Sequence, residues 1–335
     1  MLKKTVLLLL AVILFIASQA AYAENTKAKS LVSDLYDRRK MMDAQRRLSN
    51  YGPEVAEYLA PVLQDSSHDT VRVAALRIIA DVNGTSAENE VIAVLNDKNH
   101  RVRQEAARTL SIIGTSQAAV EPLKGLLNDY YPNVRYNAIK ALAKLAPKDE
   151  TDLFIKALGD YDARVRKFAV IGLGELKNPK AVPALAQLAR DPDGGVRYEL
   201  AKTLASIGTP DCVGPMTMLL GDPEQKIRLL AAQELGKIKA SSADDSLAMA
   251  ADSPDAKLAS QAITALGDRK SPKALEVARN HLSSEYMAVK IASIEVIGKM
   301  GSSSDKALLE PLMEAESTSV RMEARKALSA LESRS

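Results

Sequence analysis

One dipeptide, Val-Arg or a close variant, recurs along most of this chain at an almost constant spacing. Seven of the eight intervals between its copies are 31 residues long and one is 32. The nine copies are Val71-Arg72, Val102-Arg103, Val134-Arg135, Val165-Arg166, Val196-Arg197, Ile227-Arg228, Leu258-Ala259, Val289-Lys290 and Val320-Arg321. A unit this short cannot hide an apolar core by itself. The chain must therefore stack its repeats and bury each one against the next.

Apolar residues keep fixed positions behind each dipeptide. If the Val is position 0, they recur at positions 4, 5, 8 and 11, which lie on one face of an α-helix. Position 9 is always Ala, Ser or Gly, and Gly236 and Gly298 are two of its glycines. Glycine inside a helix costs up to about 1 kcal/mol relative to alanine. Its recurrence predicts that a neighbouring helix approaches the backbone at position 9.

The rest of each repeat carries apolar residues three or four apart, which predicts a second, shorter helix. Clear examples span residues 117–127, 180–189 and 305–313. Asp191-Pro192 and Asp222-Pro223 stand before two of the Val-Arg helices, and each pair predicts a helix N-cap followed by the first helical residue. Each repeat is therefore expected to be a helical hairpin.

An acidic residue precedes the Arg by six positions in five consecutive copies, as Asp97, Asp129, Asp160, Asp191 and Asp222. Together with the Val-Arg column, these acids resemble the HEAT family of helical repeats, in particular the short subclass named after the phycobilisome (PBS) lyases. The resemblance covers about residues 40–335. It implies an all-α superhelix, a HEAT-like solenoid of about nine hairpins. The last three copies depart from the pattern, with Ser253, Ser284 and Ala315 at the acidic position.

We interpret the recurring acids and arginines as a structural ladder. An Asp at a helix end can cap that helix or pair with an Arg at the turn between repeats, and either contact would brace the stack. In the seventh copy both members change together, to Ser253 and Ala259, as expected of structural partners. A row of charges that recognise a ligand is the alternative. The ladder consists of Asp97, Arg103, Asp129, Arg135, Asp160, Arg166, Asp191, Arg197, Asp222 and Arg228.

The first 23 residues have the layout of a secretory signal peptide. Lys3 and Lys4 form a short basic region, an apolar stretch covers residues 6–17, and Ala-Tyr-Ala at 21–23 is a cleavage site. The apolar stretch is short for a membrane span. We expect cleavage after Ala23 and a periplasmic or secreted mature chain that has no membrane contact. Retention as an uncleaved anchor is the alternative.

Residues 24–52 form a degenerate opening repeat. Ala44 and Leu48 occupy positions 4 and 8 of a copy whose position 0 is Lys40, and charged residues surround them. Solenoids need polar ends, because the terminal repeats have one open face. We therefore predict a helical cap over residues 24–52 and the HEAT-like solenoid over residues 53–335.

Bulk charge does not predict a nucleic-acid partner. The formal net charge of +3 includes Lys3 and Lys4, so the mature chain is nearly neutral. The single cysteine, Cys212, cannot form an internal disulfide, and we interpret it as a small core residue. This usage fits a bacterial periplasm better than a disulfide-rich extracellular domain. The oligomeric state stays open.

A basic stripe is predicted on the exposed face of the Val-Arg helices. Positions 2 and 6 lie on that face, and in the first five copies they carry lysines, arginines and two tyrosines. Such residues are typical of interface anchors, although a solvated helix face also carries Lys and Arg. The HEAT resemblance places this face inside a concave groove. The predicted occupant is an acidic segment of a protein partner, bound by Arg77, Arg108, Tyr136, Lys140, Lys167, Tyr198 and Lys202.

The sequence contains no motif of a catalytic or metal site. The three histidines occupy different repeat positions, and HExxH, GxSxG and glycine-rich phosphate loops do not occur. We therefore expect a non-catalytic scaffold or adaptor of the bacterial envelope, with no cofactor and no metal. The phycobilin lyases share the repeat, so a lyase-like or chaperone-like factor for a cofactor-bearing envelope protein is the alternative. A purely architectural spacer is a third possibility.

Overall fold

The computed structural model describes residues 23, 25–145 and 150–334. The predicted signal peptide lies outside the described residues, apart from Ala23. All regular secondary structure in the described residues is helical, and no helix among them is long and apolar enough to cross a bilayer. The chain divides into two compact units, Met1–Pro147 (unit 1) and Lys148–Ser335 (unit 2). Each unit is described by itself.

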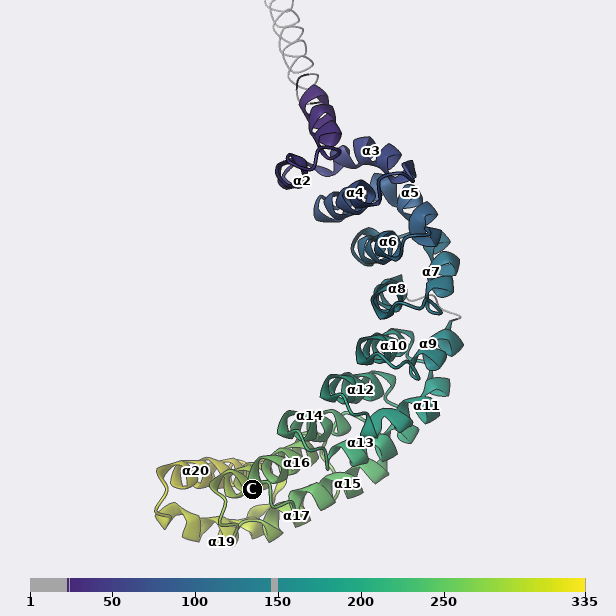
Figure 1. The fold of residues 1–335 in the computed structure, drawn as a ribbon. Coiled ribbons are helices and arrows are strands. Elements are labelled where there is room, and N and C mark those ends of the chain that lie inside the picture. Colours follow the sequence, from purple (N-terminus) through teal and green to yellow (C-terminus); the bar gives the residue numbers. More distant parts are fainter. Residues whose placement is uncertain (1–22, 24, 146–149, 335) are drawn as a thin grey trace, which may run out of the picture. The chain divides into compact units, whose positions relative to one another are not determined.

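Unit 1 alternates longer and shorter helices after an opening helix over residues 25–34. Figure 1 shows its even-numbered and odd-numbered helices in two adjacent rows. The longer helices are α2 (Met41–Leu48), α4 (Asp69–Asp81), α6 (His100–Ile113) and α8 (Pro132–Leu145). The shorter helices are α3 (Ala56–Leu59), α5 (Glu88–Ala93) and α7 (Val120–Leu126), each continuous with a 3-10 turn.

Unit 2 likewise has two adjacent rows, with its even-numbered helices on the inner side of the curve of this unit (Figure 1). The longer helices are α10 (Ala163–Leu176), α12 (Gly194–Ile207), α14 (Gln225–Leu235), α16 (Ala256–Asp268), α18 (Met287–Met300) and α20 (Thr318–Glu332). The others are α9 (Thr151–Ala157), α11 (Val182–Ala186), α13 (Val213–Leu219), α15 (Ser241–Ala251), α17 (Ala274–Asn280) and α19 (Lys306–Leu309). Each of the nine Val-Arg copies lies in one of the even-numbered helices from α4 to α20. The predicted all-α solenoid of helical hairpins is confirmed.

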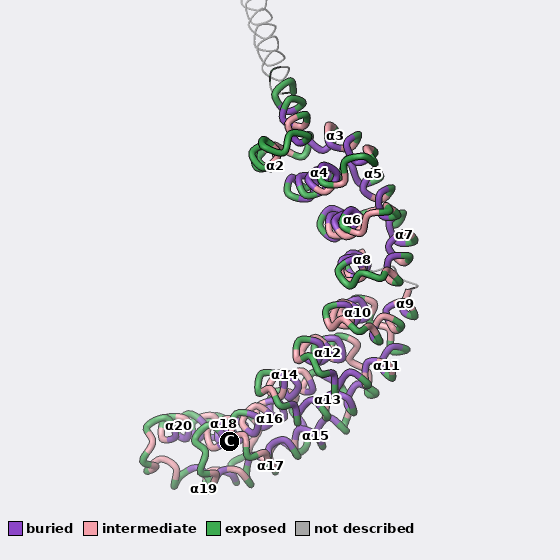
Figure 2. The backbone as a smooth tube through the Cα atoms, in the orientation of Figure 1, coloured by how far each residue is buried: buried purple, intermediate pink, exposed green. Residues whose placement is uncertain are grey.

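The predicted apolar face of the Val-Arg helices forms the core. Positions 0, 4 and 8 are buried in all nine copies, and in α6 Val102, Ala106 and Leu110 have no exposed surface. Figure 2 shows the exposed residues of these helices mostly on the side away from the shorter helices. A fully buried aliphatic side chain contributes roughly 1.5–3 kcal/mol. Stacking therefore supplies most of what holds each hairpin in place.

Adjacent long helices approach each other closely at position 9, as predicted. A Cβ atom added to Gly298 of α18 would lie 2.7 Å from the Cβ atom of Ala327 on α20 and 2.9 Å from its Cα atom. A Cβ atom on Gly236 would lie 3.2 Å from the Cβ atom of Ala265 on α16. The small residue at position 9 therefore lets the next long helix pack against the backbone.

The arginine of the Val-Arg column joins consecutive repeats. Arg197 on α12 donates from Nε and Nη2 to the Asp222 carboxylate of the next repeat, at 2.6 and 3.0 Å. Its Nη1 donates to the backbone carbonyl of Asp191 at 2.7 Å. The Arg197 and Asp222 side chains are only 8% and 1% exposed. One guanidinium thus holds the turn of its own repeat and the turn of the following repeat.

The same contact recurs in both units. The other pairs are Arg72–Asp97 and Arg103–Asp129 in unit 1, and Arg166–Asp191 and Arg228–Asp255 in unit 2. At the remaining ladder positions, Arg135 donates to the carbonyl of Asp129 at 3.0 Å, and the Asp160 carboxylate accepts the amide of Asp162 at 2.8 Å.

The register of these pairs differs from the one expected. The sequence pattern predicted a pair between the acid and the arginine of one repeat, whereas each of these arginines pairs with a carboxylate of the following repeat. The joint change at Ser253 and Ala259 is therefore not the loss of one pair. Residue 253, where the pattern would place the partner of Arg228, is a serine. Arg228 pairs instead with Asp255, two residues further along the chain. The hydrogen bond from Arg228 holds the pKa of the Asp255 carboxyl below its ordinary value.

The predicted N-caps are wrong by two residues. The N-caps of α12 and α14 are Asp193 and Glu224, which follow the predicted caps Asp191 and Asp222 by two positions. The Asp191 carboxylate instead accepts the backbone amide of Asp193 at 2.8 Å. It closes the turn before the helix and receives Arg166 at the same time. The Asp-Pro dipeptide belongs to that turn, so its proline is not the first helical residue.

A second set of polar contacts links repeats on the side of the shorter helices, and sequence analysis missed it. In unit 1 the Glu88 carboxylate accepts the backbone amides of Thr115 and Ser116 at 2.9 and 2.8 Å. In unit 2 the Asp305 carboxylate accepts two hydrogen bonds from Arg279, at 2.7 and 3.1 Å. Burial acts to raise the pKa of Asp305, but hydrogen bonds, chiefly from Arg279, outweigh it and lower that pKa.

Two glycine substitutions test the close packing at position 9. Gly298→Ala is expected to lower the free energy of unfolding by about 1–2 kcal/mol, because overpacking outweighs the better helix propensity of alanine. Gly125→Ala on α7 is the control: a Cβ atom there meets nothing within 4 Å. It should raise stability by about 0.5–1 kcal/mol. Urea unfolding followed by circular dichroism measures both, and a stabilising Gly298→Ala would contradict the close approach.

Removing a ladder carboxylate tests whether the arginine pairs brace the stack. Asp222→Ala is expected to lower the free energy of unfolding by about 3 kcal/mol, because it leaves a nearly buried guanidinium without its main partner. Glu224, 3.3 Å from Nη2 of Arg197, keeps the loss at the low end of the range for such pairs. Asp152→Ala, which breaks an exposed pair with Lys180, should change stability by less than about 0.5 kcal/mol. Equal unfolding curves for the two variants would refute the bracing role.

Candidate partner-binding surface

The predicted basic stripe lies on the long helices of both units. It comprises Arg77 on α4, Arg108 on α6, and Tyr136 and Lys140 on α8 in unit 1, and Lys167 on α10 and Tyr198 and Lys202 on α12 in unit 2. Arg77 and Lys202 are exposed, and the other five are half-buried. Each unit therefore presents its own part of the stripe to solvent.

In unit 1 a buried acid lies beneath the arginines of the stripe. The Glu105 carboxylate accepts a hydrogen bond from Nε of Arg77 at 3.2 Å and another from Nε of Arg108. The Glu105 side chain is 4% exposed, whereas that of Arg77 is 51% exposed. Two cations thus share one anion that solvent hardly reaches, and the surface they present is positive.

In unit 2 the stripe forms a compact cluster on α12. Lys202 donates a hydrogen bond to the Glu199 carboxylate at 3.0 Å, which raises the pKa of Lys202 above its ordinary value. Its Nζ atom also lies 5.9 Å from the centroid of the Tyr198 ring, within cation–π range. Lys202 stays charged at neutral pH, and Tyr198 and Lys202 act as one amphipathic surface element. The acids at position 3, Glu105 and Glu199, were not predicted, although each stands three residues before a basic residue of the stripe, Arg108 or Lys202.

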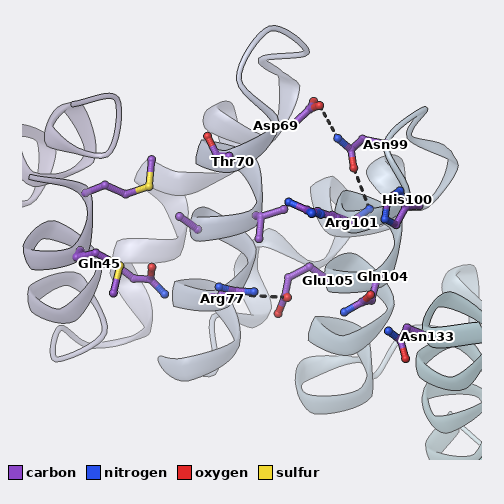
Figure 3. Close-up of a pocket in the computed structure, with 14 residues that line it drawn as sticks. Gln45, Asp69, Thr70, Arg77, Asn99, His100, Arg101, Gln104, Glu105 and Asn133 are labelled. Carbon is purple, nitrogen blue, oxygen red and sulfur yellow. Dashed lines mark hydrogen bonds and ion pairs between the residues drawn. The ribbon is translucent and has the colours of Figure 1, made fainter. Parts of the chain in front are cut away.

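A groove of about 680 Å³ opens on the long helices of unit 1 (Figure 3). It crosses α2, α4 and α6 and reaches the start of α8. From α2 the groove is lined by Met41, Met42 and the polar Gln45, and Val73 and Ala74 contribute the apolar lining from α4. Met42 is 76% exposed. The groove thus has an apolar portion at α2 and α4.

Polar residues line the groove on the side of α6. The N-cap Asn99 accepts the backbone amide of Arg101 at 2.9 Å and donates from its side-chain amide to Asp69 (Figure 3). Arg101 is exposed, and its guanidinium makes no hydrogen bond or ion pair with the described residues. The His100 ring stacks on Tyr131, with 3.9 Å between the ring centroids. This side of the groove offers a cation and hydrogen-bonding groups.

Of the residues that line this groove, the sequence-based stripe included only Arg77. The residues of α2 were assigned to a polar cap, so Met41 and Met42 were not considered as surface residues. A signal was nevertheless present. Met42 stands at position 2 of the opening repeat, the same position that Val73 and Gln104 occupy in the next two repeats.

The histidines and the cysteine have local structural contacts. His68 lies 2.8 Å from the Asp65 carboxylate, and His281 lies 2.8 Å from the carbonyl of Val277. Within residues 23, 25–145 and 150–334, no group of three or more His, Cys, Asp or Glu is arranged to hold a metal ion. Cys212 is fully buried, as expected for a core residue.

Many solved structures are similar to this chain, among them the following two. The crystal structure of an engineered protein is 20% identical to it, covers 91% of this chain and 98% of its own, and superposes with a TM-score of 0.55. The complex of CpcE and CpcF of phycocyanin lyase from Nostoc sp. PCC7120 is 22% identical, covers 73% of this chain and 94% of its own, and has a TM-score of 0.42. The first likeness concerns the fold alone, and the second is too distant to carry an argument. No curated protein matches the chain significantly.

The repeat itself is recognised along the chain. HEAT repeats match residues 56–131, 120–201, 184–259 and 245–329. These overlapping matches begin in α3 and end in α20, so they cover all nine Val-Arg copies. The chain belongs to the HEAT-repeat family.

Proposed function

We propose that this protein is a non-catalytic scaffold of the bacterial cell envelope that holds a protein partner along the exposed faces of its long helices. The observation that carries the proposal is the difference in exposure between the basic and the acidic side chains on those helices. Basic side chains reach solvent, whereas the acids that pair with them lie beneath. HEAT-type solenoids use such continuous helix faces to bind other proteins.

The difference in exposure supports an acidic partner. The Arg77 side chain is 51% exposed against 4% for Glu105, and the Lys202 side chain is 53% exposed against 21% for Glu199. An approaching carboxylate therefore meets the cation first. Complementary charge of this kind speeds encounter and selects the partner, even when the chain as a whole is nearly neutral.

The perturbed titrating groups support a scaffold rather than an enzyme. Strongly shifted pKa values often mark catalytic residues, but inter-repeat ion pairs shift them as well. The pKa of Asp255 is lowered by its hydrogen bond from Arg228, and the pKa of Arg197 is raised by its hydrogen bond to Asp222. Both shifts belong to contacts that join consecutive repeats.

The proposed envelope location is based on the predicted signal peptide at residues 1–23. When the full chain is produced in a bacterium, we expect intact-mass spectrometry of the periplasmic fraction to give a chain that starts at Glu24. A chain that keeps residues 1–23 and sediments with the membrane would contradict cleavage. When Ala21 and Ala23 are both replaced by Glu, the small-x-small cleavage site is no longer recognised. We expect this variant to keep its signal peptide.

Charge reversal on the long helices tests the binding face. We expect Lys140→Glu combined with Lys202→Glu to reduce the yield of a cross-linked partner from the native envelope at least tenfold, measured by quantitative mass spectrometry. Lys239→Glu combined with Lys257→Glu changes the same charge at two exposed lysines outside positions 2 and 6 and should leave capture intact. Equal capture by both double variants would remove this face from the proposal. Capture of no specific partner by the unaltered chain would favour a spacer.

A further inference from the structure

We infer that the groove on α2, α4 and α6 binds an extended acidic segment of a partner protein that also carries one large apolar side chain. This inference rests on the proposed protein-binding function and names the site and the chemistry of the partner. It places the main contact at the opening end of unit 1, where the sequence-based stripe had only Arg77.

The apolar part of the groove is suited to a single large side chain. Met42 is 76% exposed, and Met41 lines the groove beside it. Val73 and Ala74 extend this apolar surface onto α4. Methionine is unbranched and polarisable, so two methionines can adapt to a Leu, Ile, Phe or Met side chain. The apolar part of the groove is confined to these residues of α2 and α4, so it accepts one anchor residue rather than a broad apolar surface.

The carboxylates of the groove are already held by the protein. Asp69 receives hydrogen bonds from Asn99 and from the buried Arg72, which hold its pKa below the ordinary value. Glu105 is buried and shared by two arginines. The cations face solvent instead: Arg77 is half exposed, and Arg101 has no partner among the described residues. The complementary ligand therefore carries carboxylates.

The spacing of the helices indicates how the ligand is arranged. Packed helices lie about 8–10 Å apart, so α4 and α6 lie roughly 9 and 18 Å from α2 along the row. An extended chain advances about 3.3 Å per residue. A ligand whose apolar residue contacts Met42 then meets Arg77 about three residues away and Arg101 about five or six residues away. The two carboxylates are expected at those positions.

The polar lining of the groove favours an extended segment over a helix, because a helix uses its backbone hydrogen-bonding groups internally. An extended segment of six or seven residues covers the roughly 18 Å from α2 to α6. It also leaves its own polar backbone groups free to contact Gln104 and Asn133, which line the groove (Figure 3).

Peptide selection tests this inference and does not require the partner protein to be identified first. A random 12-residue library displayed on phage is selected against the chain comprising residues 24–335, and the enriched peptides are synthesised for fluorescence polarisation. We expect peptides with a large apolar residue and acids three and five or six positions from it. Their Kd should rise at least tenfold with Met42→Gln, at least tenfold with Arg77→Gln plus Arg101→Gln, and further as salt increases.

Matched variants separate local contacts from general effects. Met249→Gln changes an equally exposed methionine on α15, and Arg190→Gln plus Arg325→Gln removes two exposed arginines of unit 2. These controls should leave the Kd unchanged, and circular dichroism confirms that every variant is folded. The inference is overturned if no peptide is enriched, if the enriched peptides lack acids, or if they bind the groove variants as tightly as the unaltered chain.

The two proposals can fail separately. An envelope partner that binds the groove variants as well as the unaltered chain would overturn the groove while the scaffold function stands. Enriched peptides that depend on the groove, together with no envelope partner for any form of the chain, would overturn the scaffold function and leave only a peptide-binding site.

Discussion

No repeat of this chain can bury its own apolar face, and every other feature of the structure depends on that constraint. The residues at positions 0, 4 and 8 become a core only when the next hairpin covers them. How closely the next hairpin can come is decided by one small residue, because Gly298 leaves room for Ala327 to lie against the helix backbone. Close packing in turn brings the turns of consecutive repeats near enough for direct polar contacts.

Apolar packing is non-directional, so it does not by itself set the register between hairpins. The arginine contacts depend on direction, and they therefore fix the register between hairpins. A planar guanidinium that binds a carboxylate through two nitrogens and a carbonyl through the third constrains both translation and rotation. Arg197 makes this three-point contact with Asp222 and Asp191. Arg228 shows that the carboxylate and not its position in the chain is required, because Asp255 supplies it from two residues further along.

Much of the fold could be predicted because burial follows a local period. The 31-residue spacing and the helical period were enough to place the nine Val-Arg helices, α4 to α20, and the close approach at Gly236 and Gly298. The partners of the ladder could not be assigned, because in a regular repeat the acid of the same copy and that of the next copy belong to one column. The N-caps were misplaced because Asp191 is used for the turn, which leaves Asp193 to cap α12. The groove was missed because α2 was treated as an end piece.

The position of that groove has a thermodynamic consequence. In a stack held by nearest neighbours, the terminal hairpin has half the contacts of an internal one and is the first to detach. A segment bound across α2, α4 and α6 would stabilise this weakly held end, because it contacts three consecutive repeats at once. As more of the groove is occupied by ligand, a larger fraction of molecules would have the amino-terminal hairpin packed. The ligand concentration would then set how much of the stack is folded.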